Sequence, residues 1–166
     1  MRKHMMKIFV SLMVALVFLG LTGGCTGKME HEKAIRESLV EMRAMAAELG
    51  NPKIENDILY FGDVKINENF EIVDAIQAKY GCTATFFEKR GDKFVRVSTD
   101  VMHDGKRAVG TILDPEGPVI VRIRKGKPFY GTVDILGDMY ETGYEPIIDE
   151  KGEIIGVYYT GFQLEK

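Results

Sequence analysis

Residues 83–99, TATFFEKRGDKFVRVST, decide the fold of this chain. Thr83–Glu88 and Lys93–Thr99 are rich in β-branched and aromatic residues, and the turn residues Arg90-Gly91-Asp92 lie between them. Two such runs separated by a short turn predict a β-hairpin. We therefore expect these residues to form two neighbouring strands of an antiparallel sheet.

Further strands are predicted on the C-terminal side of the hairpin. They are Phe129–Leu136, Tyr140–Ile147 and Ile154–Phe162, joined by the turns Gly137-Asp138 and Asp149–Gly152. Before them, Ala108–Ile112 is short and extended. Pro118–Arg124 fits either a strand or a short helix, because its β-branched residues lie where a helix could connect strands. The order of these segments predicts an antiparallel meander.

The N-terminal side predicts two helices. Apolar residues recur at spacings of three and four between Thr26 and Gly50, which indicates a linker followed by an amphipathic helix: Ile35, Leu39, Met42, Met45 and Leu49. The short strands Ile58–Phe61 and Val64–Ile66 precede a second helix, Phe70–Tyr80. Helices followed by an antiparallel sheet predict an α+β domain with its helices on one side of the sheet.

The N-terminus has the layout of a bacterial export signal. Arg2, Lys3 and Lys7 precede an uncharged run, Ile8–Leu21, which is shorter than the ~20 residues that span a bilayer core. The following stretch, Leu21-Thr22-Gly23-Gly24-Cys25, resembles a lipobox, although Thr22 stands where Leu is usual. We expect a signal peptide over residues 1–24 and lipidation of Cys25. An uncleaved signal anchor and a soluble secreted form are the alternatives.

Charge argues against a nucleic-acid partner. The chain has a net charge of −3, and the expected signal peptide contains cationic residues but no acidic one, so the exported part is more acidic. Nucleic-acid binding needs clustered Lys and Arg. One basic stretch, Pro118–Lys127, is interpreted as a solvated face, with a partner or anionic-lipid surface as the alternative.

The sequence contains none of the enzyme signatures that we tested. Neither His31 nor His103 has a metal-ligand partner at useful spacing. There is no G-x-S-x-G motif, no phosphate-binding loop and no haem-attachment motif. Cys82 is expected to be a buried core residue rather than a nucleophile. We therefore expect no catalytic residue, no metal and no cofactor.

Arg and Tyr residues on the predicted strands are the candidate binding groups. Arg96 interrupts an apolar strand, where it serves either as an edge guard or as a clamp for an anion, because its planar fork matches a carboxylate. Arg107 follows a tight turn and belongs either to a solvated loop or to the same site. Tyr130, Tyr140 and Tyr144 lie on one predicted hairpin, either as ordinary aromatics or as hydroxyl donors.

Several blocks of the chain resemble single Cache domains of the Cache 3/Cache 2 fusion type. The blocks occur in the expected order, and the resemblance extends over roughly residues 54–162: Phe94–Val101, Asp104–Thr111, Gly126–Gly131, Leu136–Tyr140, Tyr144–Asp149 and Gly152–Gly161. The resemblance implies a PAS-like α+β fold, in which a long N-terminal helix packs on a central antiparallel sheet. The expected organisation is a linker and helix over residues 25–53 and the Cache sensor domain over residues 54–166.

The resemblance also implies a function. Cache domains of this type are extracytoplasmic input domains of chemoreceptors and sensor kinases, and they bind small molecules, often organic acids. It therefore favours a carboxylate ligand held by Arg96, Arg107, Tyr130, Tyr140 and Tyr144. Because the chain ends at Lys166, shortly after its last predicted strand, we expect no output domain and a membrane receptor or kinase as partner. The alternative is a structural or protein-interaction lipoprotein with a degenerate pocket.

Overall fold

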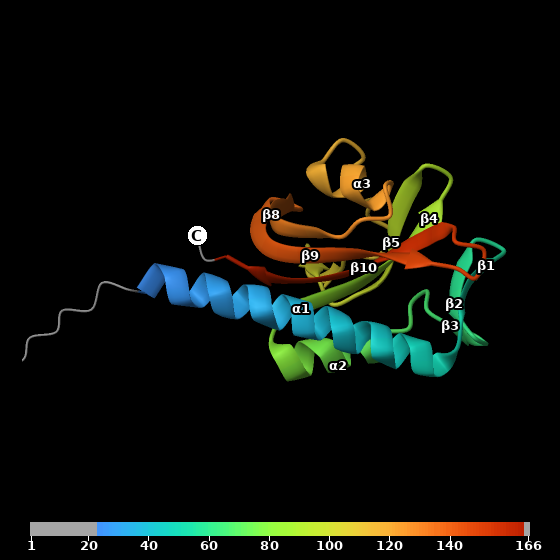
Figure 1. Ribbon diagram of the computed structural model, residues 1–166, viewed down its shortest axis with the longest axis horizontal. Coiled ribbons are helices and arrows are strands. Elements are labelled where there is room, and N and C mark those ends of the chain that lie inside the picture. Colours follow the sequence, from blue (N-terminus) through green and yellow to red (C-terminus); the bar gives the residue numbers. More distant parts are fainter. Residues whose placement is uncertain (1–22, 165–166) are drawn as a thin grey trace, which may run out of the picture.

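A five-stranded antiparallel sheet forms the centre of the computed structural model, which describes residues 23–164 (Figure 1). The strands occur in the order β5-β4-β10-β9-β8. Their bounds are Thr83–Arg90 (β4), Lys93–Thr99 (β5), Phe129–Ile135 (β8), Asp138–Ile148 (β9) and Ile154–Gln163 (β10). The predicted hairpin and the three predicted C-terminal strands are confirmed.

The predicted meander is wrong in one respect, because β10 lies between β9 and β4. Residues 155–161 of β10 are all buried, so both faces of this strand are covered. A strand that is apolar on both faces belongs at the centre of a sheet. The last strand therefore joins the hairpin β4–β5 to the hairpin β8–β9.

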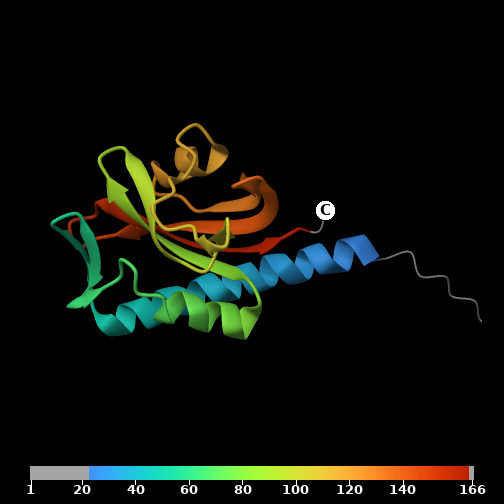
Figure 2. The ribbon, with the colours of Figure 1, turned by 180° about the vertical axis from the view of Figure 1, so that it is seen from behind.

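Two helices cover one face of the sheet. They are α1, Gly23–Leu49, and α2, Glu71–Tyr80. Figures 1 and 2 show both helices on one side of the sheet. The predicted stripe of α1 is buried at Ile35, Leu39 and Met42. The helix begins earlier than expected and replaces the predicted linker, because residues 26–34 contain several good helix formers and no proline.

Two parts of the sequence interpretation are not tested by the fold. The expected signal peptide lies outside the described residues except for its last two positions, and the side chain of Cys25 is also outside them. Within residues 23–164, no helix has the length and apolar character needed to cross a membrane.

Short elements complete the fold. A three-stranded sheet contains β1, Pro52–Glu55, β2, Ile58–Phe61, and β3, Val64–Lys65, and a small hairpin contains β6, Met102–His103, and β7, Lys106–Arg107. The sequence predicted β2 and β3 but not the other three strands. Residues 108–112 form only an isolated bridge, in which Ile112 pairs with Val95.

The face of the sheet opposite α1 is partly covered by α3, Pro118–Ile123. This helix resolves the ambiguous segment. It has proline in its first turn, which suits the start of a helix, and it buries Val119, Ile120 and Ile123 against the sheet. The sheet therefore separates two apolar clusters, one beneath α1 and α2 and the other beneath α3.

Gly143 allows α1 to approach the sheet closely. A Cβ atom at this position would lie 2.6 Å from Ile35 Cγ2, 2.7 Å from Leu39 Cδ1 and 3.0 Å from Tyr130 Cε1. Both aliphatic side chains are buried in the core, so they have little room to move. The absence of a side chain at residue 143 therefore sets the distance between helix and sheet.

We predict that Gly143→Ala lowers the free energy of unfolding by about 1–3 kcal/mol, because overpacking forces side chains or backbone to shift. Denaturant unfolding measures this change. Gly27→Ala in α1 is the matched control, since a Cβ there meets no atom within 4 Å; it should leave stability unchanged or raise it by up to about 1 kcal/mol. A Gly143→Ala protein as stable as the wild type would contradict this account of the packing.

Candidate ligand-binding site

Arg96 lies on β5 with its side chain turned into the cluster beneath α3. It is opposite Phe87 of β4, and its guanidinium carbon is 5.0 Å from the centre of the Phe87 ring. Only 4% of the residue is exposed. Its Nη1 donates a hydrogen bond to Thr111 Oγ1, whereas Nε is buried and has no hydrogen-bond partner. Within residues 23–164, no carboxylate forms an ion pair with Arg96.

A cavity of about 460 Å³ lies beside this guanidinium. Arg96 and Tyr144 line it together with residues 112–114, 117–119, 132–136 and 139. It is therefore enclosed by the segment that follows β7, by the start of α3 and by the β8–β9 hairpin. Pockets of roughly 300–1,000 Å³ are typical of small-molecule sites.

Two of the predicted tyrosines belong to the same cluster as Arg96. Tyr144 is almost fully buried and its ring centre lies 4.8 Å from that of Tyr159. Burial raises the pKa of Tyr144 well above its ordinary value, and burial also raises the pKa of Tyr140. Both hydroxyls therefore stay protonated at neutral pH and are available as donors. Tyr140 is buried in the cluster but does not line the cavity.

Burial has the opposite effect on Arg96, where it holds the pKa of the guanidinium below its ordinary value. A cation taken out of water without a counterion is unfavourable. The guanidinium and the Tyr144 hydroxyl together give the cavity wall a positive charge and hydrogen-bond donors. This arrangement suits an anion.

The structure does not bring Arg107 to this cavity. Arg107 pairs bidentately with Asp74 of α2, with Nη1 to Oδ1 at 2.7 Å and Nη2 to Oδ2 at 3.0 Å, and Nη1 also donates to the Thr99 carbonyl at 2.9 Å. Its guanidinium lies 4.2 Å from the centre of the Phe70 ring. The hydrogen bond to Asp74 raises the pKa of Arg107. Arg107 thus fastens the β6–β7 hairpin to α2.

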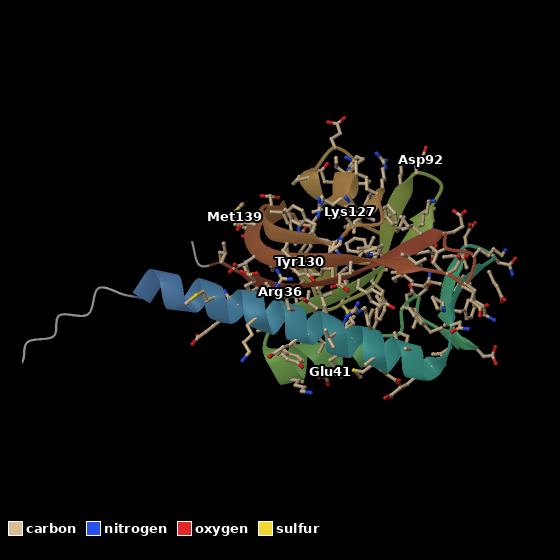
Figure 3. The ribbon with its side chains drawn as sticks, in the orientation of Figure 1. Arg36, Glu41, Asp92, Lys127, Tyr130 and Met139 are labelled. Atoms are coloured by element: carbon tan, nitrogen blue, oxygen red, sulfur yellow. The ribbon has the colours of Figure 1, made fainter. Side chains whose placement is uncertain are left out.

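Tyr130 also lies away from the cavity, on the face of the sheet that α1 covers. Its hydroxyl donates to Glu145 Oε1 at 2.6 Å, and the guanidinium of Arg36 lies 3.9 Å from its ring centre. Figure 3 shows Arg36 and Tyr130 close together where α1 meets the sheet. Glu145 also pairs with Arg43 of α1 at 3.0 Å. The pKa of Tyr130 is raised to about 12, mainly by burial and also by the hydrogen bond to the Glu145 carboxylate.

Register explains why Tyr130 and Tyr144 face opposite sides. Tyr130 pairs with Gly143 and Phe129 pairs with Tyr144. Paired residues of antiparallel strands share a face, so Phe129 points toward the cavity side and Tyr130 toward α1. The sequence pattern placed both tyrosines on one hairpin but contained no information on which residues pair.

Several residues of the site were not identified from the sequence. Thr111 accepts the hydrogen bond from Arg96. It lies in a segment for which the sequence predicted only an extended conformation. Leu136 was assigned to a strand, yet it has a φ of 56° and forms the hairpin turn with Gly137, whose φ is 96°. A Leu before Gly-Asp gives no clear signal of a left-handed residue, because such a conformation is unfavourable for Leu.

Asp100 is a buried carboxyl that the sequence interpretation also missed. Its Oδ1 accepts a hydrogen bond from the Ala84 amide at 2.6 Å, while its buried Oδ2 has no partner. Burial raises the pKa of Asp100 to about 6; the Ala84 hydrogen bond and Arg107 lower it, and Asp74 raises it. Cys82 is buried and free, as expected, and burial raises its pKa to about 11.

No group of three or more His, Cys, Asp or Glu side chains in the described part of the chain could hold a metal ion.

Comparison with known families identifies the chain's relatives. The family model for the Cache 3/Cache 2 fusion domain matches residues 38–166, which confirms the resemblance seen in the sequence. Its match begins inside α1, earlier than the sequence blocks indicated. None of the curated protein sequences compared with the chain matches it significantly.

One solved structure shows the same fold. The E. coli DcuS sensor domain is 19% identical in sequence, covers 81% of this chain and 91% of its own, and superposes with a TM-score of 0.52. This likeness confirms the expected PAS-like α+β fold. A more distant likeness is to the A. aeolicus nlh2 GAF domain in an inactive state, at 13% identity, 84% and 83% coverage and a TM-score of 0.46.

The raised pKa of Asp100 predicts a pH-dependent stability difference. The folded state favours the protonated acid, so the carboxyl increasingly destabilises the fold as pH rises from its ordinary pKa near 3.8 to about 6. Asp100→Asn keeps an oxygen acceptor for Ala84 and cannot ionise. We expect this variant to exceed the wild type in stability by about 1–3 kcal/mol at pH 7.5, and by much less at pH 4.5.

Denaturant unfolding at both pH values tests this prediction. Asp92→Asn, at an exposed turn, is the control, and its stability difference from the wild type should be the same at both pH values. If the Asp100→Asn difference is also independent of pH, Asp100 does not titrate as described.

Proposed function

The chain belongs to the Cache 3/Cache 2 fusion domain family, and on this basis we propose that it is a sensor module that binds a small organic acid in the cavity beside Arg96. Domains of this family are typically extracytoplasmic and bind small ligands. The ligand class is proposed from the site, since neither the family nor the fold specifies it.

Buried Arg96 is the observation that carries the proposal. It lines the cavity with 4% exposure, has an Nε without a partner, and forms no ion pair within residues 23–164. An unsatisfied buried polar group costs about 1–3 kcal/mol, and more when it is charged. A carboxylate in the cavity supplies the counterion that Arg96 lacks.

The geometry of the guanidinium indicates how the acid is held. Nη1 donates one hydrogen bond to Thr111, and the other N–H groups of the guanidinium have no acceptor side chain within residues 23–164. Two parallel hydrogen bonds from a guanidinium match the two oxygens of a carboxylate. Tyr144 adds a hydroxyl donor at the cavity wall, and Tyr140 lies in the same buried cluster. Arg107 and Tyr130 have structural roles in this proposal.

The same proposal places the module outside the cytoplasm, on the periplasmic side of a bacterial membrane. Its support is the sequence layout of residues 1–24, which is typical of an export signal, the lipobox-like sequence before Cys25 and the extracytoplasmic character of the family. A lipid on Cys25 anchors the domain, and a membrane receptor or kinase reads its ligand state. A lipoprotein with a degenerate pocket has less support, because the space beside Arg96 is open rather than filled by apolar side chains.

We predict that Arg96→Met removes acid binding without unfolding the domain. Thermal-shift screening of the wild type with short organic acids, amino acids and purines identifies the ligand, since a ligand at 100 times its Kd stabilises the fold by about 2.7 kcal/mol. For that ligand, calorimetry should show at least a ~100-fold loss of affinity, equivalent to about 3 kcal/mol. The variant should remain folded, because an apolar residue replaces an unpaired buried charge.

Arg107→Met removes the same charge away from the cavity and is the control. It should lower the melting temperature, because Asp74 loses its partner, but leave the affinity within a few-fold of the wild type. Undiminished binding by Arg96→Met would remove Arg96 from the site.

We also predict that Cys25→Ser abolishes incorporation of labelled fatty acid into the protein expressed in a bacterial host. The protein should then leave the membrane fraction, because stable anchoring needs the acyl chains. Cys82→Ala, which changes the buried cysteine, should keep both the label and the location. Labelling that persists in Cys25→Ser would exclude Cys25 as the modified residue.

A further inference from the structure

Residues 110–113 run along the outer edge of β5 and contact Arg96 through the backbone. The Arg96 amide donates a hydrogen bond to the Thr111 carbonyl, and the Gly110 amide donates one to the Arg96 carbonyl, both at 2.8 Å. The Leu113 amide also donates to the Phe94 carbonyl at 2.9 Å. Because β5 is an edge strand of the five-stranded sheet, these bonds hold the segment, and Thr111 with it, beside Arg96.

The side chain of Thr111 contacts the guanidinium of Arg96. Its Oγ1 accepts a hydrogen bond from Arg96 Nη1 and donates one to the Ala108 carbonyl at 2.8 Å. A hydroxyl has a single proton, so the donation to Ala108 leaves the lone pairs of Oγ1 for the guanidinium. Ala108 is held in turn, since its amide donates to the Val101 carbonyl at 2.9 Å. The acceptor for Arg96 is therefore fixed in both position and orientation.

The Phe87 ring also contacts the guanidinium, but this contact constrains it less. A cation–π attraction depends mainly on the distance between the charge and the ring, which is 5.0 Å here. A hydrogen bond also requires that the N–H group points at its acceptor. Thr111 is therefore the side chain that sets the direction of the Arg96 N–H groups.

Orientation of the guanidinium before binding affects affinity. A long side chain that is ordered only when a ligand binds loses conformational freedom at that moment, and this loss weakens binding. Arg96 lines the cavity, whereas Thr111 does not. Any effect of Thr111 on a ligand is therefore transmitted through Arg96.

From these contacts we infer that Thr111 is a positioning residue of the acid site. Its hydroxyl holds the Arg96 guanidinium in the orientation that binds a carboxylate. The inference rests on the proposed function and adds to it a residue that the ligand does not touch.

Calorimetric titration of the full chain with acetate, lactate and succinate tests this role. Thr111→Val removes the hydroxyl and keeps the branched shape. We expect it to lower the affinity for any of these acids at least about tenfold, because a hydrogen bond to a charged group is lost. The variant should remain folded, since the backbone bonds of Thr111 do not involve the hydroxyl. Thr111→Ser keeps the hydroxyl and should bind within about threefold of the wild type.

Thr160→Val is the control for the loss of a buried hydroxyl. Thr160 Oγ1 accepts a hydrogen bond from Ser38 Oγ at 3.0 Å and donates one to the Ile35 carbonyl at 3.3 Å, on the face that α1 covers. Both Val variants should have a lower melting temperature, but only Thr111→Val should lose affinity. An equal loss of affinity in Thr160→Val would overturn the inference, because lower stability alone would then explain it.

NMR of the Arg96 side chain gives a readout that needs no acid. In the full chain with isotope-labelled arginine, the Arg96 signals are those that disappear in Arg96→Met. We expect the same Arg96 Nη signals in the wild type and in Thr111→Ser. In Thr111→Val these signals should shift or broaden, because the guanidinium reorients. Unchanged Arg96 signals in Thr111→Val would contradict the inference.

The outcomes distinguish the inference from the proposed function beneath it. If binding requires Arg96 but Thr111→Val binds as tightly as the wild type, the proposed function stands and the inference is wrong. If none of the three acids binds, or if one binds Arg96→Met as tightly as the wild type, both are overturned.

Discussion

Successive side chains of β9 point to opposite faces of the sheet, and this constraint divides the molecule into a helix side and a cavity side. Tyr140 and Tyr144 turn toward the cluster beneath α3. Glu141, Gly143 and Glu145 alternate with them and turn toward α1, where Gly143 leaves room for the helix and Glu145 pairs with Arg43. One strand therefore supplies part of the candidate site and part of the helix contact, and neither half of the structure can be rearranged without the other.

The second organising feature is the placement of one cation where water is excluded. The Phe87 ring and the Thr111 hydroxyl compensate Arg96 in part, through a cation–π contact and one hydrogen bond. Neither neutralises its charge. Natural proteins retain such unfavourable groups mainly at functional sites, where a ligand completes the interaction. By contrast, Arg107 is fully compensated by Asp74 and stabilises the scaffold.

The sequence predicted the elements that depend only on residues close together in the chain. Alternation and turn residues were sufficient for the β4–β5 hairpin, both major helices and the C-terminal strands, and an Arg in an apolar strand was sufficient to select Arg96. Long-range pairing was not predictable. Asp74 precedes its partner Arg107 by 33 residues, and nothing in the sequence near Arg107 indicates that contact. The insertion of β10 beside β4, the opposite orientation of Tyr130 and the burial of Asp100 likewise depend on register and topology.

The contacts of β9 have a thermodynamic consequence. Tyr144 lines the cavity, and the adjacent Glu145 holds both Arg43 of α1 and the Tyr130 hydroxyl. A displacement of β9 when a ligand binds also displaces Glu145, whose contacts with Arg43 and Tyr130 hold the helix. Suppose that a ligand in the cavity changes the affinity of α1 for a partner protein. That partner then changes the affinity of the cavity for the ligand by the same factor, because coupling free energies are reciprocal. The affinity measured for the isolated domain is then a property of one of two states, and a protein bound to α1 sets the other.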